Sequence, residues 1–296
     1  MQILHLHCGT LSVGLAPTLG GALTYFRTQG SNGNVDWMRP WSDHGRGPLD
    51  SASFVMVPFF SWLEKDDFMF GDRHVMLPPS GFGFNRSLLG QGWTTAWTVD
   101  ELTQTLHRQR ATLSHHNHGG AWPWRYHAQQ TIELNPERLS ITVTLRNKDT
   151  SPMPAGIGLH TFFPWSKGLR VQTQVKAMHL MSELGLPYAA DPNHPAVQML
   201  AEGLELQTGL DNVFEQWNGR CTISGQHGSL RMTADSPYRF LCINAPHNAD
   251  YCCVEPVTHT TNAIHVQNID GAETGFVLLE PGASMTATAH FQPTSI

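Results

Sequence analysis

Short segments in which hydrophobic and polar residues alternate are the dominant pattern along the chain. Residues 139–147, LSITVTLRN, place Leu139 and Ile141 on one side and polar residues on the other. This period of two is typical of a β-strand with one buried face. The segment 125–134, RYHAQQTIEL, precedes it, and the NPER between them has the composition of a turn. Residues 125–147 are therefore predicted to form a β-hairpin.

The same pattern predicts two further hairpins. One would join GSLRMTAD (228–235) to YRFLCINAP (238–246), and the other would fold GFVLLEPGASMTATAHF (275–291) around its EPGA turn. More strands are expected from other alternating segments, which are 1–17, 92–108 and 169–175.

No long segment has a helical period of hydrophobic residues with caps at both ends, so helices are not expected to build the fold. Residues 183–212, rich in Pro, Gly, Asn and Asp, are expected to form an extended surface excursion. No repeat, low-complexity tract or linker-like change of composition divides the chain. Many strands at short spacing predict a single all-β domain over residues 1–296, a large antiparallel β-sandwich, with a barrel as the alternative.

Composition limits the classes of function. Hydrophobic residues make up 40% of the 296 residues and charged residues 14%, which indicates a globular protein with a large core. The formal net charge of -6 argues against nucleic acid or an anionic membrane as a partner and favours a small polar molecule. The longest apolar stretch, 51–63, is interrupted by Pro58 and is too short to span a bilayer.

Two further features predict the compartment. The first ten residues, MQILHLHCGT, lack the basic and apolar regions of a signal peptide. The five cysteines are odd in number and form no CxxC motif, so buried, reduced thiols are expected. Both features predict a cytoplasmic protein, whereas the oligomeric state leaves no signal in the sequence.

Two strand-like segments each carry an ionisable residue that is followed, at once or a few residues later, by a proline. YCCVEPVTH (251–259) carries Glu255 before Pro256, whose missing backbone donor is expected to end the strand. MPAGIGLHTFFPW (153–165) carries His160 beside aromatic residues. A solvated glutamate and a hydrogen-bonded core histidine are the plain alternatives. If the two strands face one cleft, the carboxylate and the imidazole can act as base and acid.

Other residues with binding chemistry are fewer. Asp211, in GLDNVFEQW, either makes an Asx turn before a strand or accepts hydrogen bonds from ligand hydroxyls. The nine tryptophans include candidates for a platform under a sugar ring, although most are expected in the core. The segment HHNHGG lies at an expected turn, and its His115, His116 and His118 lack an acidic partner and helical metal-ligand spacing. No metal site, phosphate loop, nucleophile elbow or dinucleotide fingerprint is predicted.

Several segments, in this order and spacing, resemble the aldose 1-epimerases, also called galactose mutarotases. They are LGGALTYFR, FVMVPFFSWL, LLGQGWTTAW, MPAGIGLHTFFP, LDNVF and CVEPVTHTTNAI. The likeness extends over nearly the whole chain and is closest to the branch with an EPxxH segment, whose histidine is His259 here. It implies the large galactose mutarotase-like β-sandwich, a monosaccharide in an open cleft, and no metal or organic cofactor.

The resemblance also implies roles for the site residues. Glu255 would be the general base that takes the proton of the sugar's C1 hydroxyl, and His160 the general acid that protonates the ring oxygen. The ring then opens to the aldehyde, the C1–C2 bond rotates, and closure in reverse gives the other anomer. Asp211 and His259 would hold the sugar. One acid and one base can each supply about 10²–10⁴-fold acceleration.

Two positions depart from the family pattern. Trp62 stands where the family has the Arg of an NR pair, and Leu89 stands where it has the His of an HG pair. Both family residues hydrogen-bond the sugar, and a hydrogen bond that involves a charged group contributes roughly 1.5–3 kcal/mol. Arg73 and Arg86 are near in sequence, but the spacing of Arg86 from Leu89 predicts the opposite strand face, and neither is identified as a replacement. Trp62 and Leu89 are therefore expected to contact the substrate and to alter the sugar preference.

Three functions remain open on the sequence. The first is an aldose 1-epimerase-like enzyme that prefers a less hydroxylated or modified sugar. The second is a sugar-binding protein that kept the cleft and lost useful turnover. The third is a sandwich domain in which His160 and Glu255 are structural and do not meet.

Overall fold

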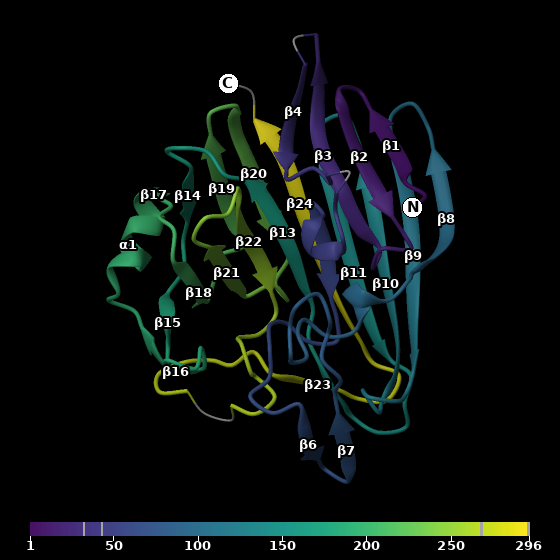
Figure 1. Ribbon diagram of the computed structural model, residues 1–296, viewed down its shortest axis with the longest axis vertical. Coiled ribbons are helices and arrows are strands. Elements are labelled where there is room, and N and C mark those ends of the chain that lie inside the picture. The colour runs from purple at the N-terminus through teal and green to yellow at the C-terminus, as the bar shows by residue number, and fades with distance from the viewer. Residues whose placement is uncertain (32, 43, 267–268, 295–296) are drawn as a thin grey trace.

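The structure, a computed structural model, describes residues 1–31, 33–42, 44–266 and 269–294 and consists mainly of β-strands (Figure 1). The strands form two large sheets, of eleven and nine strands, and two small sheets of two strands each. The ladders between the described strands are antiparallel. This confirms the prediction of a large antiparallel β-sandwich.

The larger sheet has β1 and β16 at its two edges and β13 and β22 at its centre. In spatial order it contains β1 (Leu4–Cys8), β2 (Leu11–Ala16), β3 (Ala22–Gly30), β5 (Ser53–Met56), β13 (Gly158–Pro164), β22 (Tyr251–Val257), β21 (Phe240–Ala245), β18 (Leu210–Glu215), β15 (Ala177–Met181) and β16 (Pro187–Asp191), with β4 (Gly33–Met38) paired to β3.

The second large sheet packs against the first. In spatial order it contains β17 (Leu204–Glu205), β14 (Arg170–Thr173), β19 (Arg220–Gly225), β20 (Gly228–Ala234), β24 (Ser284–Thr294), β11 (Leu139–Asn147), β10 (Arg125–Leu134), β9 (Gln109–His118) and β8 (Thr98–Gln104). The small sheets pair β12 (Met153–Ala155) with β23 (Val277–Leu279) and β6 (Asp67–Phe70) with β7 (Arg73–Met76), and two 3-10 turns cover Pro48–Asp50 and Gly92–Thr94.

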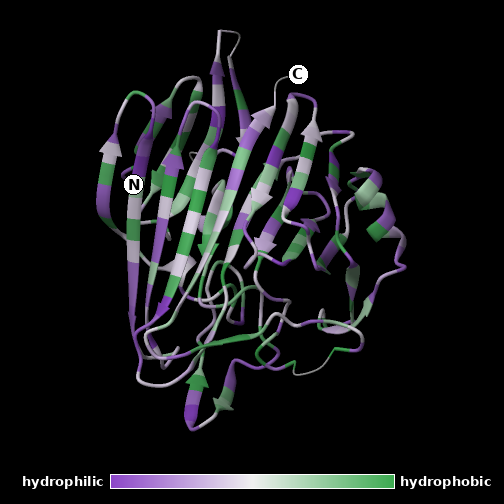
Figure 2. Ribbon diagram, turned by 180° about the vertical axis from the view of Figure 1, so that it is seen from behind, coloured by the Kyte–Doolittle hydropathy of each residue, from purple (hydrophilic) through white to green (hydrophobic). Residues whose placement is uncertain are grey.

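The core of the sandwich follows the alternation seen in the sequence. In β10 and β11 every second residue is buried, as with Ile132 and Ile141, and Figure 2 shows this alternation along the strands of the nine-stranded sheet. The two strands pair as far as Leu134↔Leu139, so the predicted hairpin is confirmed. The largest buried hydrophobic cluster takes side chains from both large sheets. Each fully buried side chain of this kind contributes about 1.5–3 kcal/mol to stability.

The other two predicted hairpins are wrong. β20 pairs with β19 and β24, whereas β21 pairs with β18 and β22, so 228–235 and 238–246 lie in different sheets. Similarly, β23 pairs with β12, while β24 pairs with β11 and β20. In both cases the chain passes from one sheet to another at the turn. A turn signal shows that a strand ends, but it does not show which strand pairs with the next one.

The strand that carries the site glutamate does not end before Pro256, as the sequence predicted, but continues through it to Val257. The ladder between β13 and β22 is interrupted between the pairs Gly158↔Val257 and Phe162↔Cys253. Pro256 therefore has no partner residue on β13, so a proline without a backbone N–H is tolerated at this position.

The segment 183–212 is not irregular throughout, because it contains β16, β17 and one helix, α1 (Pro195–Glu202). The helix begins with a proline, which needs no hydrogen bond in the first turn, and the His194 ring accepts a hydrogen bond from Ala196 N. Gly203 ends it with a φ of 101°. The hydrophobic pattern does not reveal this helix because eight residues span little more than two turns. None of the helices in the described ranges has the length and hydropathy needed to cross a membrane.

Candidate functional site

The eleven-stranded sheet uses its two faces differently. On β21 and β22, Leu241, Ile243 and Val254 belong to the core between the large sheets, whereas Cys242 and Cys253 belong to a second cluster. Because side chains alternate along a strand, this second cluster lies on the face turned away from the nine-stranded sheet. Alternate residues of β13, β22 and β21, together with residues of β18, line a cavity of about 560 Å³ on that face. This volume lies within the range of small-molecule sites.

Five of the six residues predicted for the site line this cavity: His160, Asp211, Glu255, Trp62 and Leu89. The first three come from the central strands β13, β18 and β22, and the last two come from connections between strands. The structure therefore brings together residues that lie far apart along the chain. It also excludes the alternative in which the histidine and the glutamate occupy separate places.

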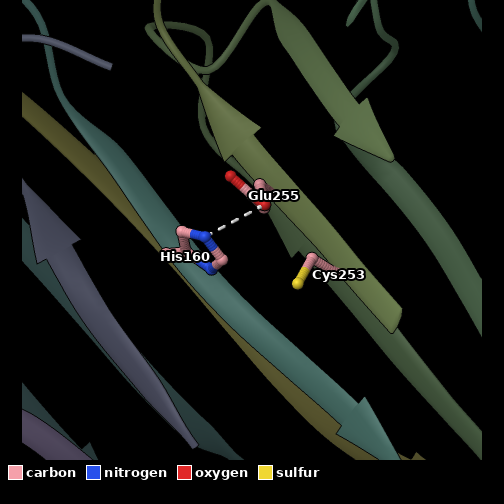
Figure 3. A group of neighbouring side chains, drawn as sticks. All are labelled: His160, Cys253 and Glu255. Atoms are coloured by element: carbon pink, nitrogen blue, oxygen red, sulfur yellow. Dashed lines mark ion pairs between the residues drawn. The ribbon is translucent and has the colours of Figure 1, made fainter. Parts of the chain in front are cut away.

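His160 and Glu255 line the cavity, and their side chains point toward each other from adjacent strands (Figure 3). His160 Nε2 lies 3.6 Å from Glu255 Oε1, and the two side chains are 15% and 4% exposed. The imidazole stacks on Phe162, with 4.4 Å between ring centroids, and packs against Phe54 at 4.8 Å. These rings hold the imidazole in place, while its buried Nδ1 has no hydrogen-bond partner among the described residues.

The interrupted ladder between β13 and β22 lies beside this pair. There the Thr161 hydroxyl donates a hydrogen bond to the carbonyl oxygen of Val254. Each of these residues is adjacent in sequence to a member of the pair. A side-chain hydrogen bond thus takes the place of backbone ladder bonds at the point where the imidazole and the carboxyl group meet.

Burial shifts the two pKa values in opposite directions. It raises the pKa of Glu255 well above its ordinary value, and repulsion from Asp211 adds to the rise. It lowers the pKa of His160 to about 3, and the positive charge of Arg39 adds to the drop. Because burial disfavours charge on both groups, it favours the neutral carboxyl group and the neutral imidazole over the ion pair. A proton donor and a proton acceptor therefore lie next to each other.

Arg39 supports the aromatic side of the site. Its guanidinium carbon lies 4.0 Å from the ring centroid of Phe162 and 4.3 Å from that of Tyr251. It also donates hydrogen bonds to the backbone carbonyl oxygens of Leu49 and Ser51. Cation–π contacts that are shielded from water are stronger than exposed ones. No motif marked Arg39 in the sequence, so this residue was missed.

Two thiols of the cavity, those of Cys242 and Cys253, were also missed. Both are buried free cysteines and line the cavity. A signal for Cys253 was present, because it lies two residues before Glu255 on the same strand and must share its face. Cys242 lies directly opposite Glu255 on β21. The site thus contains two soft sulfur atoms beside the imidazole and the carboxyl group.

Asp211 lies within β18, opposite Asn244 of β21, and does not form the turn that was the alternative prediction. Its side chain is exposed to the open side of the cavity. Partial desolvation raises its pKa, and the hydrogen bond with the Asn244 side chain opposes this rise. A carboxylate in this position can accept hydrogen bonds from ligand hydroxyls.

Trp62 and Leu89 form one wall of the cavity through two strained turns. Ser61 and Leu89 both have a left-handed backbone, with φ values of 61° and 62°, and Leu89 N donates to Ser61 O at 2.7 Å. Trp62 forms a bridge with Leu88 beside this bond. A left-handed non-glycine residue costs about 1–3 kcal/mol and is often found at a functional site.

The prediction that Arg86 faces away from this wall is wrong, because its segment is a loop and not a strand. The Arg86 guanidinium carbon lies 4.3 Å from the ring centroid of Trp62. The same indole is close to Gly185, where an added Cβ would lie 3.2 Å from it. Arg73, by contrast, pairs with Asp149 at 2.5 Å. In this wall the Trp62 indole therefore lies close to both the Arg86 guanidinium group and the turn at Gly185.

His259, the sixth predicted site residue, does not line the cavity. It is 4% exposed, its Nε2 accepts a hydrogen bond from Phe60 N at 3.0 Å, and its Nδ1 donates to Thr260 O at 2.7 Å. A Cβ added at Gly156 would lie 2.1 Å from its ring. The absence of a side chain at Gly156 therefore leaves room for the His259 ring, whose two nitrogens hydrogen-bond the backbone.

The family of the chain is decided by its match to a family model described as aldose 1-epimerase, which covers residues 6–292. The chain belongs to the aldose 1-epimerase family. This confirms the resemblance drawn from its motifs. Most tryptophans are buried, as expected, and Trp62 lines the cavity of this epimerase-family chain.

Several similar proteins match most or all of the chain. The uncharacterized protein YphB of Escherichia coli strain K12 is 25% identical over 271 residues, covering 84% of this chain and 86% of that protein. A galactose mutarotase-like protein from Clostridium acetobutylicum has a TM-score of 0.86 at 17% identity, covering 99% of this chain and 95% of that chain. A GalM/aldose epimerase homologue from C. elegans has a TM-score of 0.80 at 14% identity, covering 100% and 99%. These structural likenesses show the shared fold.

Proposed function

We propose that this protein is an aldose 1-epimerase-like isomerase, which interconverts the α and β anomers of an aldose. Glu255 accepts the proton of the C1 hydroxyl, and His160 donates a proton to the ring oxygen. The ring opens to the aldehyde, the C1–C2 bond rotates, and the two transfers run backwards to close the other anomer. No net proton is gained or lost, because the pair starts and ends with one.

The observation that carries this proposal is the placement of one imidazole and one carboxyl group 3.6 Å apart in a cavity of about 560 Å³. After ring opening the carboxyl group holds the proton and the imidazole is neutral. Burial favours this same charge state, since it raises the pKa of Glu255 and lowers that of His160. The cavity floor thus stabilises the product of the first proton transfers more than the charged pair that precedes them.

Substrate preference is proposed from the wall of the cavity. Trp62 and Leu89 supply apolar surface where the family has two sugar-binding polar residues, so a less hydroxylated or modified aldose fits better. Asp211 on the other side is available to a pair of ring hydroxyls. Among the described residues that line the cavity there is no Lys or Arg, which argues against a phosphorylated sugar.

The rate of anomer exchange, followed by polarimetry or NMR on freshly dissolved α-anomers, tests the proposal. Wild type is expected to accelerate exchange of at least one aldose in a broad panel, and Glu255→Gln to lose about 10²–10⁴-fold of that acceleration. Glu280→Gln makes the same change at an exposed position outside the cavity and should retain full activity. Equal rates for wild type and Glu255→Gln across the panel would exclude the epimerase.

A sugar-binding protein without useful turnover is the second candidate. The apolar wall of the cavity favours it over a sandwich domain in which His160 and Glu255 are only structural. It predicts saturable sugar binding, measured by calorimetry, with anomer exchange at the buffer rate. The same panel separates the two candidates, because binding and exchange are measured on the same sugars.

The organisation of the chain and its location are part of the proposal. The largest buried cluster includes residues from Leu6 to Phe291, which supports one domain over residues 1–296. All five cysteines are free and buried, which supports a cytoplasmic protein.

A further inference from the structure

The floor of the cavity brings three different metal-binding groups together. His160, Cys253 and Glu255 each offer one ligand atom, and these atoms lie within 4.8 Å of one another (Figure 3). The geometry points to a binding site for a thiophilic divalent cation of the Zn²⁺ class, held by His160 Nε2, the Cys253 thiolate and the Glu255 carboxylate. This inference concerns a ligand other than the sugar.

The spacing suits zinc. Zn²⁺ binds nitrogen and oxygen at about 2.0–2.2 Å and sulfur at about 2.3 Å, so tetrahedral ligand atoms lie about 3.3–3.8 Å apart. His160 Nε2 and Glu255 Oε1 are 3.6 Å apart, which already fits an edge of that tetrahedron. The sulfur needs to move by about 1 Å or less, since no ligand atom is more than 4.8 Å from another. A χ1 adjustment of a cysteine side chain covers such a shift.

The set of ligands is that of an open zinc site and not of a closed structural one. Three protein ligands leave the fourth position to water or another small ligand. The cavity of about 560 Å³ has room for it, and the nitrogen, sulfur and oxygen donors together favour Zn²⁺ over Mg²⁺ or Ca²⁺. Binding places metal bonds on the thiolate and the carboxylate, and the protons of the thiol and of the carboxyl group leave to solvent.

Occupation of this site has a direct chemical consequence. The metal takes the nitrogen and the carboxylate that the proposed function needs for proton transfer, and it stands where the anomeric centre would lie. Zn²⁺ and an aldose are therefore mutually exclusive ligands. This consequence rests on the proposed function, whereas binding of the metal itself does not.

One other group of histidines competes for metal in an experiment. The rings of His116 and His127 stack with centroids 4.4 Å apart on the β9–β10 hairpin, and His118 lies beside His116 at 6.1 Å. This surface group contains no thiol. The double substitution His116→Gln and His118→Gln removes it and provides the background for all measurements.

Titration of the metal-free protein with Co²⁺ and Zn²⁺ tests the site. One Co²⁺ per chain is expected to give the near-ultraviolet charge-transfer band of a cobalt–thiolate bond, and Zn²⁺ is expected to displace it. Cys253→Ser should abolish the band and weaken Zn²⁺ binding by about 100-fold or more, measured by competition with a chromophoric chelator. Cys221→Ser, which removes a buried thiol of the other large sheet, should change neither by more than about twofold.

The outcomes are distinct. Absence of one-to-one binding overturns the inference, and so does binding without the thiolate band. A band that survives Cys253→Ser and is lost in Cys242→Ser also overturns it, because the neighbouring thiol would then be the ligand. Circular dichroism confirms that each variant is folded. None of these readouts requires turnover, so failure of the epimerase proposal leaves the metal test intact.

Discussion

The protein contains two histidine–glutamate pairs that differ in environment. His179 Nε2 lies 3.2 Å from Glu215 Oε2, with both side chains almost fully buried. His160 Nε2 lies 3.6 Å from Glu255 Oε1 at the floor of an open cavity. The residue types are the same, and both pairs join strands of the eleven-stranded sheet. Their surroundings decide what each pair can do.

The His179–Glu215 pair has a partner for each of its groups. His179 Nδ1 hydrogen-bonds Thr260 Oγ1 at 2.8 Å, and Glu215 Oε2 accepts a hydrogen bond from Glu273 N at 3.0 Å. Burial lowers the pKa of His179, while its hydrogen bond and charge attraction with Glu215 oppose that shift. A buried polar network that is satisfied in this way fixes one arrangement of the strands.

The His160–Glu255 pair lacks such partners. The buried Nδ1 of His160 has no hydrogen-bond partner in the described structure, and aromatic contacts hold the ring in their place. The comparison shows that a buried acid–base pair indicates function when its bonds are incomplete and a cavity adjoins it.

The largest expected effect is on activity, which should depend on the His160–Glu255 pair. His160→Gln is expected to reduce acceleration of anomer exchange by about 10²–10⁴-fold, because it removes the proton donor to the ring oxygen. His227→Gln changes an exposed histidine outside the cavity and should be neutral. NMR exchange rates, corrected for the buffer rate, measure both. Retention of most of the acceleration in His160→Gln would contradict the assigned role.

The next largest effect is on the free energy of unfolding, which should depend on the His179–Glu215 pair. Glu215→Ala should lower the free energy of unfolding by about 3–5 kcal/mol, because it leaves His179 and the Glu273 N–H without a partner in the core. Glu205→Ala removes an exposed carboxylate from a surface pair and should cost less than about 1 kcal/mol. Urea denaturation at neutral pH compares the two variants. Similar losses would mean that the buried pair contributes no more than a surface pair.

A third test uses pH. The pKa of Glu255 is raised in the folded state, so wild type loses stability as pH rises from the unfolded to the folded pKa. Glu255→Gln removes this loss and should become more stable than wild type by about 1.4 kcal/mol per pH unit within that window. The two proteins should differ least in acid. Thermal melting at several pH values measures the trend, and parallel curves would show an unshifted carboxyl group.

The smallest expected effect tests the cavity wall at Trp62 separately from the His160–Glu255 pair. Arg86→Ala removes the cation–π contact with Trp62, which contributes about 0.5–1 kcal/mol at an exposed position. KM for the preferred aldose should rise by about two- to fivefold, whereas kcat should stay unchanged. Arg46→Ala removes another loop arginine outside the cavity and serves as the control. A drop in kcat would show that the wall takes part in the chemistry.

The sequence predicted the fold class and five residues that line the cavity, because alternation fixes which residues of a strand share a face. Leu139 and Ile141 lie in the core as predicted, and His160 and Glu255 meet as their motifs suggested. It failed where the answer depends on non-local geometry. The turn before β21 gives no information on which sheet receives the strand.

The errors at single residues have the same origin. Arg86 was assigned to a strand face, and a strand rule does not apply to a loop. His259 follows the EPxxH pattern, yet its ring turns toward the backbone of Phe60 and Thr260. Side-chain direction in both cases is set by contacts with segments that are distant in sequence.

The separation between strands and connections has an evolutionary consequence. His160 and Glu255 stand on central strands whose opposite faces build the core, so insertions there would invert which residues face inward. Trp62, Leu89 and the Gly185 turn stand on connections, where length and composition are free to drift. This arrangement allows the ligand preference to change through the connections while the His160–Glu255 pair keeps its place on the strands.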